Sequence, residues 1–322
     1  VWFRLSYRPE RRQSTKIVIT SPFYLPAIAA LAVRGQSPII NLVNDLFPDA
    51  LVYSSMISRG GLLDRLLSRV TGYSIRHCQA SVFLGNKLRS LAISRYGKPQ
   101  VSSVIPVGSE SSWFQQPPGD CPTNTTIRIL YSGAMGHMHE IETLAKAIEL
   151  GLPDGIFLQF HSFGFGYGKL RSRLLSTSDS FKEKVGLAGA LDHTAWTTAM
   201  RSSPIALITL KPGAEGVSFP SKTFSSLMAG QAILAICSKE SDLANLVQDL
   251  DCGWVVEPGD VEGLRRILQA LSGLKEEIGR KRQNAYHLGH SKFSMQSILS
   301  LWAALFEQLA TDEPLRDRAV VI

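Results

Sequence analysis

The chain has 322 residues, of which 44% are hydrophobic and 19% are charged, and its net charge is +7. This composition excludes a wholly disordered chain and allows two domains, each with a core of its own. The longest apolar stretch near the start, residues 22–33, is shorter than the roughly 20 residues of a membrane-spanning helix, so we expect no such helix.

The positive charge is concentrated in the first third of the chain. Residues 1–100 hold 14 Lys and Arg against 4 Asp and Glu, a net +10, which leaves −3 for residues 101–322. This asymmetry favours an anionic partner for the first part, either a phospholipid surface, a lipid diphosphate or nucleic acid. The alternative is a set of solvated arginines on an ordinary protein surface.

The cysteines give no sign of a disulfide framework or a zinc site. The four of them are scattered along the chain without a C-x-x-C pair. This spacing favours reduced thiols in a cytosolic protein. No signal peptide is visible after Val1.

Short β-branched runs alternate with longer helical stretches along most of the chain. The strands predicted in the first part are 16–20, 39–43, 80–84 and 104–106. Those predicted in the second part are 127–131, 156–161, 185–187, 205–209, 232–236 and 253–256. The alternation predicts an α/β protein with two Rossmann-like, doubly wound domains of parallel strands, facing a cleft that is the expected ligand site.

A proline- and glycine-rich stretch, residues 115–122, interrupts this pattern and predicts the domain boundary. We therefore expect one domain over residues 1–117 and a second over residues 118–293. Residues 294–322 are predicted to form a closing amphipathic helix and a tail. The apolar residues of this helix recur at the spacing of one helix face: Ile298, Leu299, Trp302, Leu305, Phe306 and Leu309.

A basic amphipathic helix is predicted where apolar residues recur at helical spacing from Leu62 to Val70. Its apolar residues are Leu62, Leu63, Leu66, Leu67 and Val70. The arginines interleaved with them are Arg59, Arg65, Arg69 and Arg76. The pattern is compatible with a helix lying on an anionic membrane surface, or with a core-facing helix that keeps its arginines outside.

The first glycine-rich segment follows the strand predicted at 127–131. Gly133 and Gly136 allow a tight turn before a helix, where free N–H groups attract anions such as a diphosphate; a purely structural turn is the alternative. His137 and His139 are spaced like metal ligands, but no Cys or carboxylate set accompanies them, so we expect no metal.

Two further motifs have a functional and a structural interpretation. Gly164, Gly166 and Gly168 form a second glycine-rich turn, which either lines a nucleotide pocket or relieves backbone strain. Asp249 and Asp251 resemble the D-x-D motif with which some sugar transferases hold a metal. Their place after a helical stretch favours a solvated helix end instead.

The segment 214–222 is the most informative part of the chain. It follows the apolar strand 205–209 and brings Glu215, Ser221 and Lys222 to the start of a helix. Ligands of parallel α/β sheets bind at such strand ends. A lysine there would neutralise the charge that grows on a departing diphosphate, whereas the alternative for Glu215 and Lys222 is a surface ion pair.

These residues resemble the donor-site segment of glycosyltransferase family 4, in particular bacterial members that build surface polysaccharides. The similarity covers residues 206–236, with Pro-Ser-Lys at 220–222 and Met-Ala-Gly-Gln-Ala-Ile-Leu-Ala at 228–235. Supporting stretches are 130–136, 164–168 and 241–260 in the second domain, and 20–22, 44–50 and 105–108 in the first.

The resemblance implies a GT-B fold and a hexosyltransferase that takes its sugar from a nucleotide-diphosphate sugar, retains the anomeric configuration and needs neither metal nor cofactor. Lys222 and the segment 133–137 would hold the diphosphate, Glu215 would orient the sugar, and Asp45 would face the acceptor. The remaining donor-site residues would be Gly164, Gly166, Ser221 and Ser225. The implied acceptor is a saccharide or a lipid-linked saccharide, with no nucleic acid partner, for an enzyme of the cytoplasm or of the inner face of the membrane.

Three departures from the family pattern leave alternatives open. Ser225 stands where many members have a second glutamate that contacts ribose, and Asn44 stands where many have a histidine. The first strand and glycine-rich turn of the N-terminal domain are absent before Val1, so we expect either a fragment or a degenerate protein. The alternatives to a transferase are a non-catalytic nucleotide-sugar-binding or scaffold protein, and a GT-B nucleotide-sugar epimerase.

Overall fold

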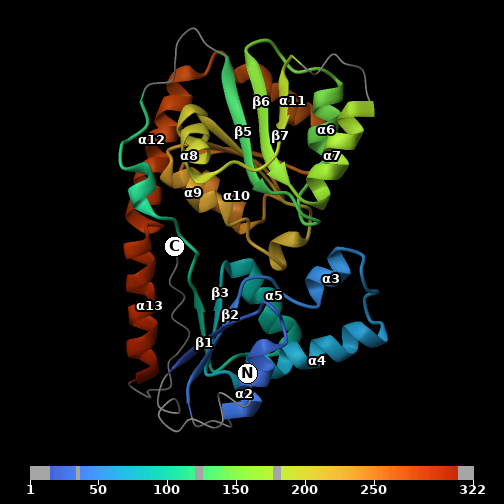
Figure 1. Ribbon diagram of the computed structural model, residues 1–322, viewed down its shortest axis with the longest axis vertical. Helices are drawn as coiled ribbons and strands as arrows, with labels where there is room; N and C mark the ends of the chain where they lie inside the picture. Colours follow the sequence, from blue (N-terminus) through green and yellow to red (C-terminus); the bar gives the residue numbers. More distant parts are fainter. Residues whose placement is uncertain (1–14, 34–36, 120–125, 177–182, 311–322) are drawn as a thin grey trace. The chain divides into compact units, whose positions relative to one another are not determined.

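The computed structural model describes residues 15–33, 37–119, 126–176 and 183–310, and the chain forms two compact units (Figure 1). The first unit comprises Val1–Pro106, Ala214–Phe219 and Leu299–Ile322. The second comprises Val107–Gly213 and Pro220–Ile298. Each unit is built around one parallel sheet, so the predicted α/β class is confirmed.

The sheet of the first unit has four parallel strands in the order β1-β2-β3-β4. Their bounds are β1 Lys16–Ile19, β2 Ile39–Val43, β3 Ala80–Phe83 and β4 Val101–Val104. The strand predicted over 104–106 was misplaced, because β4 ends at Val104, the first residue of that range. Pro106 has no N–H to donate to a ladder, and two serines in β4 hide the apolar pattern.

In the described part of the chain, four helices connect the strands of this sheet. They are α2 Leu25–Val33, α3 Asp49–Tyr53, α4 Leu62–His77 and α5 Asn86–Tyr96. The helix predicted from the apolar spacing between Leu62 and Val70 is confirmed as α4. A short 3-10 turn, η4 Ala214–Gly216, also belongs to this unit and packs on α5, where Gly216 approaches Leu91.

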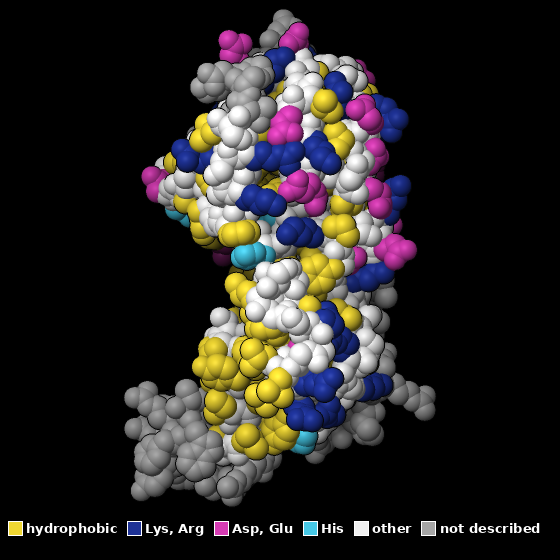
Figure 2. Space-filling view, turned by 90° about the vertical axis from the view of Figure 1, so that its right-hand side faces the viewer, with side chains coloured by type: hydrophobic (Ala, Val, Ile, Leu, Met, Phe, Trp, Pro, Cys, Tyr) yellow, Lys and Arg dark blue, Asp and Glu magenta, His cyan; other side chains and the backbone are white. Residues whose placement is uncertain are grey.

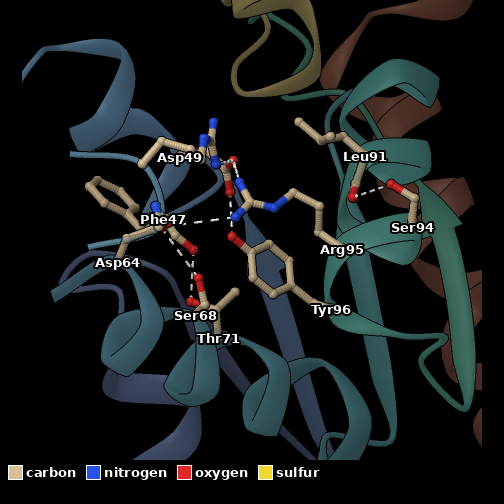
Figure 3. A network of polar contacts seen from close by, with 11 residues as sticks. Phe47, Asp49, Asp64, Ser68, Thr71, Leu91, Ser94, Arg95 and Tyr96 are labelled. Carbon is tan, nitrogen blue, oxygen red and sulfur yellow. Dashed lines mark hydrogen bonds and ion pairs between the residues drawn. The ribbon is translucent and has the colours of Figure 1, made fainter. Parts of the chain in front are cut away.

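A buried carboxylate organises the polar interior of the first unit (Figure 3). Asp49 is fully buried and forms ion pairs with Arg95 and, at 2.7 Å, with Arg59. It also accepts a hydrogen bond from the Tyr96 hydroxyl, and burial together with this carboxylate raises the pKa of Tyr96. A buried charge is costly unless it is paired, so these contacts hold the segment after β2 in place.

The sheet of the second unit has six parallel strands in the order β10-β9-β8-β5-β6-β7. Their bounds are β5 Ile127–Ala134, β6 Ile156–Phe163, β7 Val185–Ala188, β8 Ile205–Thr209, β9 Ala232–Ile236 and β10 Gly253–Val256. The last three have the predicted bounds. β5 and β6 run further than predicted because their ladder continues through Gly133, which pairs with Ser162.

The helices of the second unit cover both faces of the sheet. They are η2 Ser111–Phe114, α6 Glu142–Glu149, α7 Phe165–Ser176, α8 His193–Ser202, α9 Lys222–Met228, α10 Asp242–Asp249, α11 Val261–Leu271 and α12 Lys275–Lys292. Apolar residues of α6, α7 and α11 share one core with the sheet, while Met200 of α8 and Met228 of α9 pack with Leu130 on the other side (Figure 1).

The predicted C-terminal helix is also confirmed, as α13 Met295–Ala310. Ile298 and Leu305 on it are buried, as the apolar spacing predicted, whereas Leu299 is 54% exposed. In the part of the chain that the structure describes, no helix combines the length and the apolar character that crossing a bilayer requires. Cys78, Cys237 and Cys252 are buried and form no disulfide within the described residues, and Cys121 lies outside them.

The strand order of the second unit determines where a ligand is expected. The chain adds strands in one direction from β5 to β7, and then returns to the other side of β5 with β8. The carboxyl ends of β5 and β8 therefore flank the point at which the strand order reverses. Open α/β sheets bind ligands at such a point.

Candidate functional site

Lys222 lies at the carboxyl end of β5. It is the first residue of α9, and its Nζ donates a hydrogen bond to the carbonyl oxygen of Ala134 at 2.9 Å. The same ammonium lies 3.8 Å from the centroid of the Tyr131 ring and donates to the Tyr131 hydroxyl. The structure therefore places a cation at the switch point of the sheet.

The surroundings of Lys222 disfavour its charge in the unliganded chain. The residue as a whole is half-buried, but its ammonium is enclosed, and burial lowers the pKa of Lys222 to about 7. A phenol, a carbonyl and a ring face replace only part of the hydration that an ammonium loses. An anion placed beside Lys222 would restore its charge.

His139 connects the segment after β5 to the end of β8. Its Nδ1 lies 2.8 Å from the carbonyl oxygen of Thr209, and because a carbonyl only accepts, Nδ1 carries the proton. Burial, together with the charge of Lys222, lowers the pKa of His139 to about 3. His139 is therefore neutral at physiological pH and holds the two strand ends together.

The loop after β5 offers free backbone donors. The N–H of Met135 donates to Phe163 at 2.8 Å, but no acceptor among the described residues meets the N–H of Gly136 or His137. Helix α6 starts only at Glu142, and its first turn is capped by Glu140, which accepts from the N–H of Thr143 at 2.8 Å. The N–H groups that an anion could reach thus belong to the loop rather than to the helix.

The glycines of the second motif bring α7 close to this loop. Gly164 has φ +101°, and the N–H of Gly166 donates to the carbonyl oxygen of Met135 at 2.8 Å. A Cβ on Gly166 would lie 2.7 Å from the carbonyl oxygen of Gly136. Since α7 begins at Phe165, the predicted turn over 164–168 was wrong beyond its first residue, and the glycines allow close packing of backbone on backbone.

The two serines flank Lys222. Ser221 is exposed and precedes α9 without making a side-chain cap. The Oγ of Ser225 donates to the carbonyl oxygen of Lys222 at 3.0 Å. A small pocket lies over β5 and β8 and is also lined by residues of α8 and α9. Its lining includes Ser225, Lys222, Ser132 and Gln231, whose Oε1 has no partner among the described residues.

Asp45 and Glu215 lie in the first unit. Asp45 forms an isolated β-bridge with Ser218. Burial raises the pKa of Asp45, and the hydrogen bond from Ser218 lowers it by less, so the pKa is raised overall. One Glu215 oxygen is buried without a partner in the described part of the chain. Its charge adds to burial in raising the pKa of Tyr53. The segment 214–219 thus joins the loop after β2.

The predicted site residues therefore form two groups. The second unit brings together Lys222, Ser221, Ser225, Gly133, Gly136, His137, Gly164 and Gly166. In this group the His137 ring stacks on Phe165, with ring centroids 4.1 Å apart. Tyr131 was not predicted as the partner of Lys222, although its position at the end of a predicted strand, two residues before Gly133, is a usable signal.

The described residues contain no group of three or more His, Cys, Asp or Glu side chains that could hold a metal ion. Asp249 is the last residue of α10, which confirms the predicted helix end for the D-x-D motif. Asp251 forms ion pairs with Arg280 and, at 2.5 Å, with Lys281.

Comparison with known proteins identifies the fold. No protein-family model matches the chain. It is 23% identical over 242 residues to the probable glycosyltransferase WbjE of Pseudomonas aeruginosa. The matched region covers 72% of this chain and 59% of WbjE. The chain thus spans less than two thirds of the length of this relative.

Solved GT-B structures superpose on most of the chain. Anabaena HepE in complex with UDP has a TM-score of 0.69 at 12% identity, covering 92% of this chain and 79% of HepE. Sucrose-phosphate synthase from Thermosynechococcus elongatus has a TM-score of 0.69 at 14% identity, covering 93% and 74% of the two chains. The chain has the GT-B fold, as the resemblance implied.

Proposed function

We propose that this chain is a glycosyltransferase that takes a hexose from a nucleotide-diphosphate sugar. The observation that supports the proposal is the position of the Lys222 ammonium, at the carboxyl end of β5 and beside the switch point of the second unit. The unpartnered N–H groups of Gly136 and His137 lie on the loop that follows the same strand. Together they offer a cation and two backbone donors to a diphosphate.

The proposed chemistry makes use of this positive charge. In sugar transfer the bond between the anomeric carbon and the diphosphate oxygen breaks, and an acceptor oxygen bonds to that carbon. Negative charge grows on the departing diphosphate, and Lys222 would stabilise it more in the transition state than in the bound donor. Transfer without a metal is part of the proposal because Lys222 supplies this charge. Retention of configuration rests on the sequence resemblance alone.

The donor is proposed to be a UDP-hexose. The structure of HepE has been solved with UDP-glucose, at a TM-score of 0.69, and with UDP. WbjE, which is matched over 72% of this chain, is described as a probable glycosyltransferase. UDP and UDP-glucose are therefore the first ligands to test.

Asp45 is proposed to face the acceptor, and Glu215 to orient the sugar of the donor. The raised pKa of Asp45 suits a group that takes up a proton from an acceptor hydroxyl, and the unpartnered oxygen of Glu215 is free to accept from sugar hydroxyls. The acceptor class, a saccharide or a lipid-linked saccharide, and a location in the cytoplasm or on the inner face of the membrane are carried over from the sequence resemblance.

The proposal is tested by removing the cation. We expect Lys222→Ala to weaken UDP binding by about 30-fold, as loss of a charged hydrogen bond does, and to reduce sugar transfer by about 100-fold or more. Titration calorimetry measures the first effect and release of UDP from UDP-glucose the second. Lys146→Ala, which removes an exposed lysine of α6 in the same unit, is the matched control and should change neither. Unchanged UDP binding by Lys222→Ala would remove Lys222 from the donor site.

One observation favours a second candidate function. Ser225 stands where the family pattern has a second glutamate, and its hydroxyl donates to the carbonyl oxygen of Lys222 within α9. A non-catalytic nucleotide-sugar-binding protein would bind UDP-glucose with the same dependence on Lys222 but release no UDP with any acceptor. An epimerase would convert the donor in the absence of an acceptor.

A further inference from the structure

Helix α4 exposes apolar side chains that the interior of the first unit does not use. Leu62, Leu63 and Leu66 are 84%, 56% and 52% exposed. The helix packs through its other side, where Thr71, Gly72, Ser74 and Ile75 are buried. The core-facing alternative for these leucines is therefore wrong.

Arginines share this exposed side. Leu62 and Leu66 are four positions apart, as are Arg65 and Arg69, and each arginine follows a leucine by three, so the four residues lie on one face, which we name the α4 outer face. Arg65 and Arg69 are exposed, and their side chains have no hydrogen-bond or ion-pair partner in the described part of the chain. Figure 2 shows hydrophobic side chains beside Lys and Arg side chains on the first unit.

The acidic residues that lie near α4 in the sequence are withdrawn from the surface, whereas the exposed Glu307 of this unit lies on α13. The described residues up to 106 contain three, and Asp49 and Asp64 are buried while Asp45 is half-buried. Asp49 is neutralised by Arg59 and Arg95. The outward charge beside the exposed leucines is therefore basic, and it is complementary to a surface that is both apolar and anionic.

We propose that the α4 outer face binds an anionic phospholipid surface. The leucines would enter the boundary between headgroups and acyl chains, while Arg65 and Arg69 pair with lipid phosphates. The long arginine side chains can reach the phosphates from a helix that lies in the plane of the interface. This inference does not depend on sugar transfer, because lipid binding is measured without any sugar.

The test is co-sedimentation of the full chain with vesicles. We expect binding to vesicles that contain phosphatidylglycerol, little binding to pure phosphatidylcholine, and weaker binding as ionic strength rises. Arg65→Ser with Arg69→Ser should weaken partitioning about 30-fold, since two basic contacts are lost. Leu62→Ser with Leu66→Ser should weaken it roughly tenfold or more.

A matched control is available in α7 of the second unit. Arg171 and Leu175 are also exposed and lie four positions apart, so Arg171→Ser with Leu175→Ser removes the same residue types elsewhere. This control should partition like the wild type. Thermal melting checks that every variant is folded.

Two results would overturn the proposal. One is a failure of the vesicle test: the wild-type chain does not sediment with anionic vesicles, or the α4 variants lose no more binding than the α7 control. The other is self-association: if the wild type is a dimer that Leu62→Ser with Leu66→Ser dissociates, and it does not bind vesicles, the α4 outer face covers a second copy of the chain instead.

Discussion

The ammonium of Lys222 lies against the face of Tyr131 and donates to its hydroxyl, although 91 positions separate the two residues. The ring and the hydroxyl both favour the charged lysine, while burial opposes it. Under the proposed function, Tyr131 would be a positioning residue that holds the Lys222 ammonium in place for the diphosphate.

The first prediction separates these two contributions. Tyr131→Phe keeps the ring and removes the hydroxyl, so we expect the free energy of unfolding to fall by about 1 kcal/mol and UDP to bind a few-fold more weakly. Tyr131→Leu also removes the ring and should weaken UDP binding further. Urea denaturation and titration calorimetry measure the two quantities. Equal UDP affinity in all three proteins would show that Tyr131 does not act on Lys222.

The second prediction concerns proton uptake. Because the pKa of Lys222 is lowered to about 7, the free chain holds mostly neutral amine above pH 7, whereas a bound diphosphate favours the ammonium. Binding of UDP at about pH 8 should therefore take up as much as one proton, and apparent affinity should fall as pH rises further. Calorimetry in buffers with different ionisation enthalpies measures the uptake. Lys222→Ala should abolish it, and uptake that survives this change would come from another group.

The same shift has a consequence for stability. In the unfolded chain Lys222 has its ordinary pKa of 10.5, so between pH 7 and pH 10.5 the unfolded state binds more protons than the folded state. The contribution of Lys222 to the free energy of unfolding therefore grows with pH across this window. The free energy of unfolding of the wild type, measured by urea denaturation, should therefore rise relative to that of Lys222→Met between pH 7 and pH 10.5.

The third prediction uses two glycines of α7. A Cβ on Gly166 would lie 2.7 Å from the carbonyl oxygen of Gly136, whereas a Cβ on Gly168 would meet nothing within 4 Å. Gly166→Ala should lower the free energy of unfolding by about 1 to 3 kcal/mol and weaken UDP binding, because the loop must move. Gly168→Ala should leave binding unchanged and stabilise the helix by as much as about 1 kcal/mol. If the two variants behaved alike, the close approach at Gly166 would not matter.

The fourth prediction concerns Asp49. Asp49→Asn leaves Arg59 and Arg95 without their carboxylate, and we expect the free energy of unfolding to fall by about 2 to 3 kcal/mol. This loss is smaller than is usual when a buried ion pair is broken, because the Arg59 side chain is half-exposed and can be hydrated. Asp154→Asn, at the exposed ion pair with Lys184, is the control and should have no measurable effect. Denaturation in urea distinguishes them, and equal losses would contradict a special role for Asp49.

Much of the fold could be predicted because it is encoded locally. The runs 205–209, 232–236 and 253–256 are strands with the predicted bounds, since buried parallel strands are continuous apolar segments. β4 was misplaced because serines interrupt its pattern, and β5 was predicted too short because Gly133 is typical of a turn. Lys222 was predicted as a site residue from its place after a strand.

The rest depends on contacts between distant parts of the chain. Tyr131 and Lys222 meet because β5 and β8 are neighbours in the sheet. This strand order cannot be deduced from any single segment of the sequence. Helical spacing gave the apolar and basic residues of α4 but not which of them faces outward. That Glu140 caps α6 required the true start of the helix, which lies beyond the glycine pair.

Ala214–Phe219 belong to the first unit, although the residues on either side of them in the sequence belong to the second. Neither unit is therefore continuous in the sequence. The N–H of Leu46 donates to the carbonyl oxygen of Val217 at 2.8 Å, so a loop encoded in the middle of the second unit is anchored elsewhere. A gene fragment cut at residue 107 would separate this loop from its anchor. Isolating the second unit as a module therefore calls for a short polar linker in place of residues 214–219.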